Sequence, residues 1–317
     1  MKKNIYMDLE MSEKNKFEEA IKLISEGKRK EAVDMLLVLY QGASDYANKL
    51  SIIDALLNAL DSINDNVKLI EICDEGIRIA KKLHALDYKA YFMGRKAEVL
   101  KHRNINWEYQ RKNLTLAPGW FGFSLVSDKN QHAEITAKIE NNNREIAKLI
   151  SKAQFIAERS GNQTVIAYVL TSKGSISSAQ YLDFKMQCVV DKPRVVRLFK
   201  FHLLRRLILK YAWLLGKAQR RKLRTIMESF TTDYLQAAKI YEKLGDVKAG
   251  YAYYNLANQM RTSYRFRKAK QYLARAESIA KVNDDLLLHQ KIIDMVKTIK
   301  AKNKDIPNYL AGETRAG

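Results

Sequence analysis

Apolar residues recur every three or four positions along almost the whole chain, a pattern typical of amphipathic helices. Proline, the strongest helix breaker, occurs only at Pro118, Pro193 and Pro307. The pattern and the turn residues predict N-terminal helices at about 11–26, 28–41, 46–62, 66–84 and 86–103. After a loop at about 116–130, they predict helices at about 131–159, 163–186, 194–224, 226–244, 248–261, 265–281 and 284–301. The expected fold class is therefore all-α.

A short apolar pair, followed by a polar loop and a new helix, recurs along the chain. It is found at Leu39-Tyr40, Ile79-Ala80, Ile156-Ala157, Ile240-Tyr241 and Ile279-Ala280. Successive pairs are 40, 77, 84 and 39 residues apart, which corresponds to one, two, two and one periods of about 40 residues. Three of the pairs lead into an Ala-Tyr dipeptide, at Ala90-Tyr91, Ala167-Tyr168 and Ala252-Tyr253. The chain is expected to be an array of stacked helix pairs in which two units are degenerate.

The clearest unit spans residues 250–281. Its first helix carries Tyr253, Leu256, Ala257 and Met260, and its second carries Phe266, Ala269, Leu273 and Ala276. Small residues that face large ones let two helices cross closely. This unit resembles the tetratricopeptide repeat, and residues 17–40 resemble it more distantly through Ala20, Gly27 and Ala32. The resemblance implies antiparallel helix pairs, stacked as a right-handed α-solenoid of degenerate repeats of about 34–42 residues.

The charge of the chain is concentrated in its C-terminal part. Residues 192–317 hold 28 Lys and Arg against 10 Asp and Glu, which is +18 of the total net charge of +21. The first 191 residues are nearly neutral. Because a field of one sign attracts the opposite charge, we expect the C-terminal part to bind an anionic partner.

The first candidate site lies in residues 192–227, which contain five Lys, seven Arg and no Asp or Glu. On a helix, Leu204, Leu207, Ile208, Tyr211 and Leu215 form an apolar stripe. The opposite arc, expected to bind an anionic surface, holds Arg205, Arg206, Lys210, Trp213, Lys217, Arg220, Arg221 and Arg224. Trp213 could insert at a lipid interface or stack on a base. The alternative is a long helix inserted among the repeats, with its leucines in the core and its charges merely solvated.

The second candidate site lies in residues 247–276, which contain seven Lys and Arg, no Asp or Glu, and several aromatic residues. The resemblance to tetratricopeptide repeats implies that Tyr251, Tyr254, Asn258 and Arg261 line a concave groove, and we add Arg265 from the same basic stretch. Asn can hold a peptide backbone and Arg a carboxylate, which suits an extended acidic peptide. The alternative is that the aromatic residues belong to the core.

A third candidate is the loop around Trp120, Phe121 and Phe123, which forms either an exposed binding lip or a plug between helix pairs. The sequence contains no metal-binding histidine motif, nucleophile elbow or glycine-rich phosphate loop. We therefore expect no enzymatic activity, no metal and no cofactor. Charged residues rule against a membrane-spanning helix in the apolar window 195–215, and the first residues do not have the pattern of a secretion signal.

Together these patterns predict a cytoplasmic scaffold or adaptor, built from tetratricopeptide-like repeats, that binds an acidic protein segment through its basic C-terminal half. Two alternatives remain: a helical-repeat protein that binds RNA or DNA, and a protein attached to the inner face of a membrane through residues 194–224. The predicted segments are N-terminal repeats 1–115, central repeats 116–191, a basic insertion 192–227, C-terminal repeats 228–302 and a tail 303–317.

Overall fold

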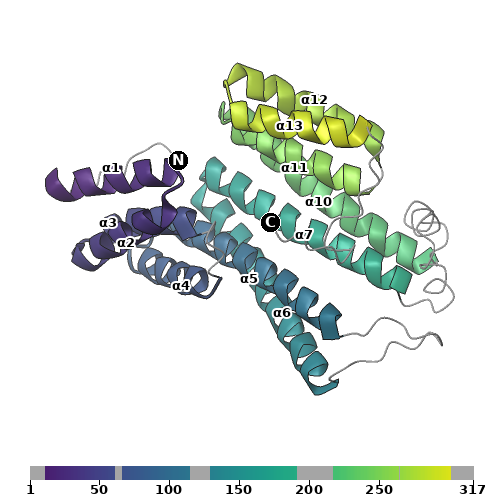
Figure 1. Ribbon diagram of the computed structural model, residues 1–317, viewed down its shortest axis with the longest axis horizontal. Coiled ribbons are helices and arrows are strands. Elements are labelled where there is room, and N and C mark those ends of the chain that lie inside the picture. Colours follow the sequence, from purple (N-terminus) through teal and green to yellow (C-terminus); the bar gives the residue numbers. More distant parts are fainter. Residues whose placement is uncertain (1–10, 61–65, 115–128, 191–216, 264, 301–317) are drawn as a thin grey trace. The chain divides into compact units, whose positions relative to one another are not determined.

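The computed structural model describes residues 11–60, 66–114, 129–190, 217–263 and 265–300 (Figure 1). The described residues form helices joined by short turns and contain no strand, which confirms the all-α prediction. The helices are α1 (Met11–Ser25), α2 (Arg29–Gly42), α3 (Tyr46–Leu60), α4 (Asn66–Lys82), α5 (Leu86–Leu114), α6 (Lys129–Ser160), α7 (Gln163–Val190), α10 (Lys217–Lys243), α11 (Lys248–Thr262), α12 (Phe266–Val282) and α13 (Leu286–Lys300).

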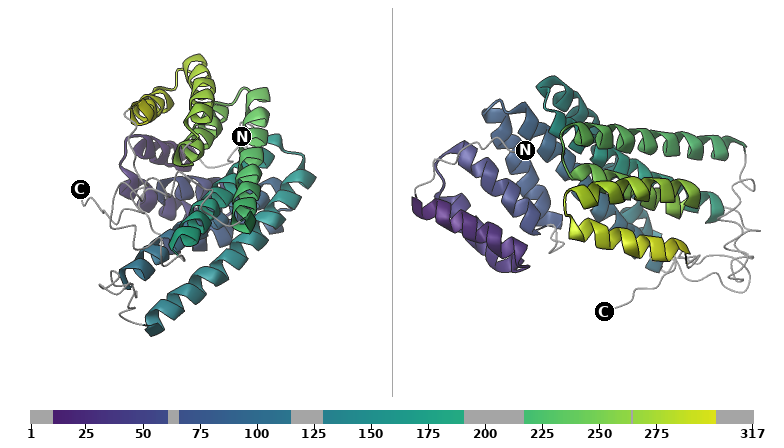
Figure 2. Two further views of the ribbon diagram at one scale, coloured as in Figure 1. Left: turned by 90° about the vertical axis from the view of Figure 1, so that its right-hand side faces the viewer. Right: turned by 90° about the horizontal axis from the view of Figure 1, so that it is seen from above.

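The helices pack against their neighbours in the sequence, as expected for a helical repeat. Helices α1 to α4 contact one another in succession, and so do α10 to α13. In addition α1 contacts α3, and α11 contacts α13, so that alternate helices also meet. Figure 1 and Figure 2 both show α11, α12 and α13 side by side. This arrangement of consecutive pairs is compatible with the repeat organisation predicted from the sequence.

The chain divides into two compact units. The first contains residues 1–108 and 135–172, and the second contains residues 109–134 and 173–317. A core that runs from Ala20 to Val99 lies in the first unit, and a core that runs from Tyr181 to Ile299 lies in the second. The five segments proposed from the sequence stay a prediction.

Core positions of the clearest repeat are as predicted. Seven of its eight signature residues are buried, and Phe266 packs against the same core while remaining partly exposed. Ala20 and Ala32 in the distant repeat are also fully buried. Burial of small residues between large ones lets α11 and α12 approach closely.

The recurring apolar pairs lie in the last turn of a helix. After four of the five pairs, the turn that ends the helix contains a residue with positive φ, which lies five positions after the first residue of the pair. These four residues are His84, Gly161, Gly245 and Asp284. In three of these cases the backbone N–H of the next residue bonds back to a helix carbonyl, for example from Ala85 to the carbonyl of Ala80 at 2.9 Å, whereas the N–H of Asn162 donates to the Ser160 hydroxyl oxygen at 3.3 Å. This left-handed C-terminal turn satisfies carbonyls that the helix leaves without partners. After Leu39-Tyr40 the chain instead continues extended at Ala43, with ψ 123°.

Tyrosine hydroxyls join helices that are one or two repeats apart. They donate to carboxylates in the pairs Tyr40 to Glu75, Tyr91 to Asp54, Tyr168 to Glu98 and Tyr251 to Asp285, at separations of 35, 37, 70 and 34 residues. Burial, helped by the neighbouring carboxylates, raises the pKa of Tyr40 and of Tyr251 to about 12. These hydroxyls therefore remain donors at neutral pH, and the bonds hold successive repeats in register.

Two predicted helix boundaries are wrong. Helix α10 is continuous from Lys217 to Lys243, whereas the sequence analysis placed a break at 225. No glycine or proline occurs there, and the buried stripe that begins at Leu223 continues through Met227 and Phe230, so nothing interrupts the helix. Helix α5 ends at Leu114 rather than near 103. The aromatic loop around Trp120 and the whole segment 192–216 lie outside the described residues.

The turn at His84 provides a test of the left-handed geometry. His84 has φ 52°, which is unfavourable for a residue with a Cβ atom and favourable for glycine. We expect His84→Gly to raise the free energy of unfolding by about 1 kcal/mol, measured by urea denaturation. The matched reverse change, Gly245→Ala, should lower it by a similar amount, because nothing lies within 4 Å of the added Cβ and only the backbone is strained. Destabilisation by His84→Gly would contradict this account.

Candidate partner-binding site

One wall of the candidate site is the first half of α10. Leu223, Met227 and Phe230 form a buried stripe at helical spacing, and Phe230 packs edge-on against Tyr181 of α7 with 5.8 Å between ring centroids. Arg224, one residue from this stripe, is exposed, as is Glu228 one turn later. The core contacts therefore fix the helix, and the side chains that border the stripe are presented at its edge.

Helix α10 is also held by a buried ion pair. The Nζ atom of Lys173 in α7 lies 3.1 Å from Oδ1 of Asp233, and the Asp233 residue is only 4% exposed. Burial raises the pKa of Asp233 above the ordinary aspartate value, although Lys173 acts in the opposite direction. Loss of Lys173 would leave a buried charge without its partner, which is strongly unfavourable.

The opposite wall is the beginning of α12. The backbone N–H of Arg265 donates to the carbonyl of Met260 at 2.8 Å, and the Arg265 carbonyl accepts from Ala269 at 3.0 Å. These bonds place Arg265 directly before the helix and Lys268 within its first turn. That first turn contains no acidic residue.

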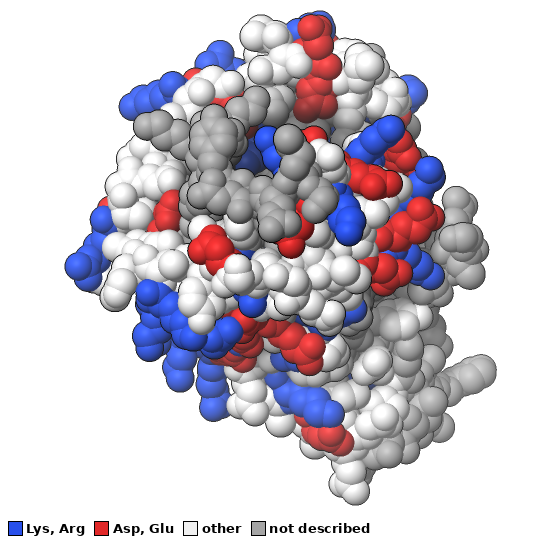
Figure 3. Space-filling model, turned by 90° about the vertical axis from the view of Figure 1, so that its left-hand side faces the viewer, with Lys and Arg blue, Asp and Glu red and all other residues white. Residues whose placement is uncertain are grey.

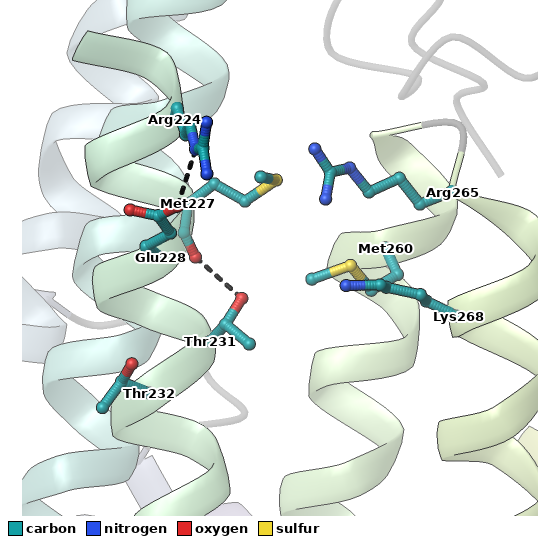
Figure 4. Close-up of a pocket in the computed structure, with 8 residues that line it drawn as sticks. All are labelled: Arg224, Met227, Glu228, Thr231, Thr232, Met260, Arg265 and Lys268. Atoms are coloured by element: carbon teal, nitrogen blue, oxygen red, sulfur yellow. Dashed lines mark hydrogen bonds and ion pairs between the residues drawn. The ribbon is translucent and has the colours of Figure 1, made fainter. Parts of the chain in front are cut away.

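Between the two walls lies a cavity of about 440 Å³. It is lined by Arg224, Met227, Glu228, Thr231 and Thr232 of α10, Met260 of α11, and Arg265 and Lys268 at the start of α12. Figure 4 shows Arg265, Lys268 and Met260 extending toward α10, and Met227 extending toward them. The structure thus brings together Arg224 and Arg265, which the sequence analysis had assigned to two different candidate sites.

The cations of this cavity differ in their partners. Nε of Arg224 lies 2.8 Å from Oε1 of Glu228, so this pair is internally neutralised. Arg265 and Lys268 are exposed and have no salt-bridge partner among the described residues. The start of a helix adds partial positive charge of its own. The wall formed by α12 therefore carries positive charge that forms no ion pair within the described part of the chain.

Charge is distributed differently elsewhere on the protein. In the first unit, Lys96 bridges Asp74 at 2.8 Å and Glu145 at 3.0 Å, and Arg78 pairs with Glu75. Figure 3 shows a face on which Asp and Glu side chains lie among Lys and Arg side chains. Away from the cavity, the second unit also pairs charges: Nε of Arg275 in α12 lies 2.9 Å from Oε1 of Glu242 in α10.

The other residues predicted for the groove lie in α11 and do not line this cavity. The Tyr251 hydroxyl donates to Oδ1 of Asp285 at 3.3 Å, and Nζ of Lys291 lies 5.5 Å from its ring centroid. Tyr254 packs against the core while remaining partly exposed. Arg261 donates from Nε and Nη2 to Oδ1 of Asn258, at 3.2 and 3.0 Å. Tyr251 is thus engaged with Asp285 and α13, Arg261 with Asn258, and Tyr254 with the core.

Much of the predicted basic arc falls outside the described residues. This holds for Arg205, Arg206, Lys210 and Trp213 entirely, and for the side chains of Lys217 and Arg220, whose backbone belongs to α10. Arg221 is exposed, in keeping with its predicted place on the basic arc. Lys222, which the prediction omitted, lies with its Nζ 4.3 Å from the ring centroid of Phe184.

Sequence reasoning also missed several residues of the cavity. Met227 ends the candidate segment 192–227 but was given no role in it, and Met260 was assigned to the core; both residues are buried. Lys268 was visible as part of the acid-free stretch 247–276, but its position on the same wall as Arg265 depends on where α12 begins. No sequence pattern marks Glu228, Thr231 and Thr232 as residues of a binding site, because they lie beyond the predicted break in α10.

The described residues offer little other chemistry. No group of three or more His, Cys, Asp or Glu side chains lies where it could hold a metal ion within the part of the chain that the structure covers. Burial raises the pKa of the Cys73 thiol to about 12, so it remains protonated and unreactive at neutral pH. None of the helices, over their described lengths, is both long and apolar enough to cross a membrane.

Comparison with models of protein families finds no family that matches the chain, and comparison with curated proteins finds no match either. The candidate site is therefore defined by its own geometry: a cavity between α10 and α12, with an apolar floor and a positively charged wall.

Proposed function

We propose that the protein is a non-enzymatic scaffold, built as a right-handed solenoid of tetratricopeptide-like repeats, that binds an acidic protein segment in the cytoplasm. The observation that carries the proposal is the cavity in which Arg265 and Lys268 face α10 and form no ion pair with any residue that the structure describes. A carboxylate that enters would form charge-assisted hydrogen bonds with both side chains. The strong positive charge of residues 192–317 would attract such a partner from a distance.

The proposal can be tested by reversing the charges of the cavity. We expect Arg265→Glu combined with Lys268→Glu to weaken binding of a fluorescein-labelled poly-glutamate peptide by about tenfold or more, measured by fluorescence anisotropy in moderate salt. The matched control is Arg267→Glu with Lys270→Glu, which changes the net charge equally at two exposed positions of α12 that do not line the cavity. The control should lose much less affinity.

Two results would count against this function. Equal losses in the two double variants would mean that the peptide responds only to overall charge. Tighter binding to single-stranded RNA or to vesicles of anionic lipid than to the acidic peptide, under the same salt, would favour the nucleic-acid or membrane alternatives instead.

A further inference from the structure

We propose that the cavity selects acidic segments in which a large apolar side chain lies next to the carboxylate. This inference rests on the proposed function. A segment of this kind places its apolar side chain on the two methionines and its carboxylate on the wall formed by α12. The class of partner is thus an amphipathic acidic peptide rather than a purely charged one.

The floor of the cavity carries the first part of the inference. Met227 and Met260 come from different helices, are 7% and 2% exposed, and belong to one core cluster. A thioether offers no strong hydrogen bond, so a polar group placed on this floor would lose its water without compensation. Methionine side chains are unbranched and adapt to apolar ligands of irregular shape. The floor therefore favours an aliphatic or aromatic side chain.

The second part of the inference, the position of the carboxylate, rests on the difference in charge between the two walls. Arg265, directly before α12, and Lys268, in its first turn, both line the cavity from this wall. On α10, Glu228 pairs with Arg224, and the Thr231 hydroxyl donates to the carbonyl of Met227 at 2.7 Å, which leaves its oxygen as an acceptor. The α10 wall is neutral overall and offers acceptors to the N–H groups of a ligand, whereas the α12 wall attracts the carboxylate of the ligand.

The size of the cavity agrees with one anchoring residue and its neighbours. Pockets of about 300–1,000 Å³ are typical of small-ligand sites, and the volume of about 440 Å³ lies near the lower end. It accommodates one large apolar side chain together with an adjacent carboxylate. Burial of a leucine side chain corresponds to roughly tenfold or more in affinity, so the floor should give measurable selectivity.

The test compares two labelled peptides on the full chain. Both consist of alternating Asp and Glu; one has a central leucine and the other a central serine. We expect the leucine peptide to bind about tenfold more tightly to the unchanged protein in fluorescence anisotropy. Met227→Gln should bring this ratio close to one, and Met227→Leu should preserve it. Lys268→Glu should weaken both peptides by the same factor and leave the ratio intact, because it alters the wall and not the floor.

The possible results distinguish a failure of this inference from a failure of the proposed function. Equal binding of the two peptides by the unchanged protein overturns the inference and leaves the proposed function standing, whereas binding of neither peptide overturns both. A ratio that survives in Met227→Gln also overturns the inference, because the leucine would then contact another part of the protein. Thermal unfolding of each variant checks that α10 remains folded. If Met227→Gln does not fold, the ratio of the two peptide affinities, measured on the unchanged protein and on Met227→Leu, still tests the inference.

Discussion

Phe230→Ala is expected to lower the free energy of unfolding of the second unit by about 4 kcal/mol. Phe230 is fully buried and packs edge-on against Tyr181, so its removal loses both the transfer energy of the ring and an aromatic contact. It also leaves a cavity beside α10 that the surrounding helices cannot fill without moving. Urea unfolding followed by circular dichroism would measure the loss.

The matched control is Phe155→Ala in α6. Phe155 is 59% exposed and contacts Arg159 through its ring face, with 5.7 Å between the guanidinium carbon and the ring centroid. The same chemical change should therefore cost only about 0.5 kcal/mol. Similar losses in the two variants would show that Phe230 is not a core residue and that α10 is packed differently.

Gly76→Ala is expected to destabilise the first unit by about 2 kcal/mol, although alanine is ordinarily the better helix former. A Cβ atom at Gly76 in α4 would lie 2.8 to 3.0 Å from three ring carbons of Phe92 in α5. The Phe92 ring is fully buried and is flanked by Tyr88 and Tyr91, with centroids 6.1 and 5.3 Å away. Because the ring has no free space to move into, α4 and α5 must separate.

Gly42→Ala provides the control for this second prediction. Gly42 is the last residue of α2, and the nearest side-chain atom to an added Cβ is the Oε1 of Glu13 at 3.8 Å, an ordinary contact distance. The change should be neutral or slightly stabilising. Thermal unfolding of both variants would show opposite signs, and a neutral Gly76→Ala would mean that α4 and α5 are not so closely packed.

The helices and the repeat period could be predicted from the sequence because each depends on local pattern. Ile79-Ala80, Ile240-Tyr241 and Ile279-Ala280 were recognised as recurring pairs, and the structure shows why they recur: each lies at a helix end that needs a left-handed turn. His84 and Asp284 occupy that turn where glycine is the usual residue, and for this reason the turn motif itself could not be identified from residue type.

The candidate site could be predicted only in part. The acid-free stretch 247–276 indicated where positive charge is concentrated, and Arg224 and Arg265 each appeared in a candidate set. Their place in one cavity depends on the packing of α10 against α11 and on the exact start of α12, which no local pattern specifies. The ion pairs of individual cations could not be predicted either, since the sequence does not show that Glu228 pairs with Arg224 while Lys268 forms no ion pair with another described residue.

The tyrosine–carboxylate bonds have a consequence for how the protein folds. Three of the four join residues 34 to 37 positions apart, and the fourth joins residues 70 apart, so these bonds span one or two periods. Three of them close loops of nearly the same length, and the entropy lost in closing a loop grows only slowly with its length. A chain whose contacts are this local has low contact order. Folding can therefore begin in any repeat and spread to its neighbours, without waiting for distant segments to meet.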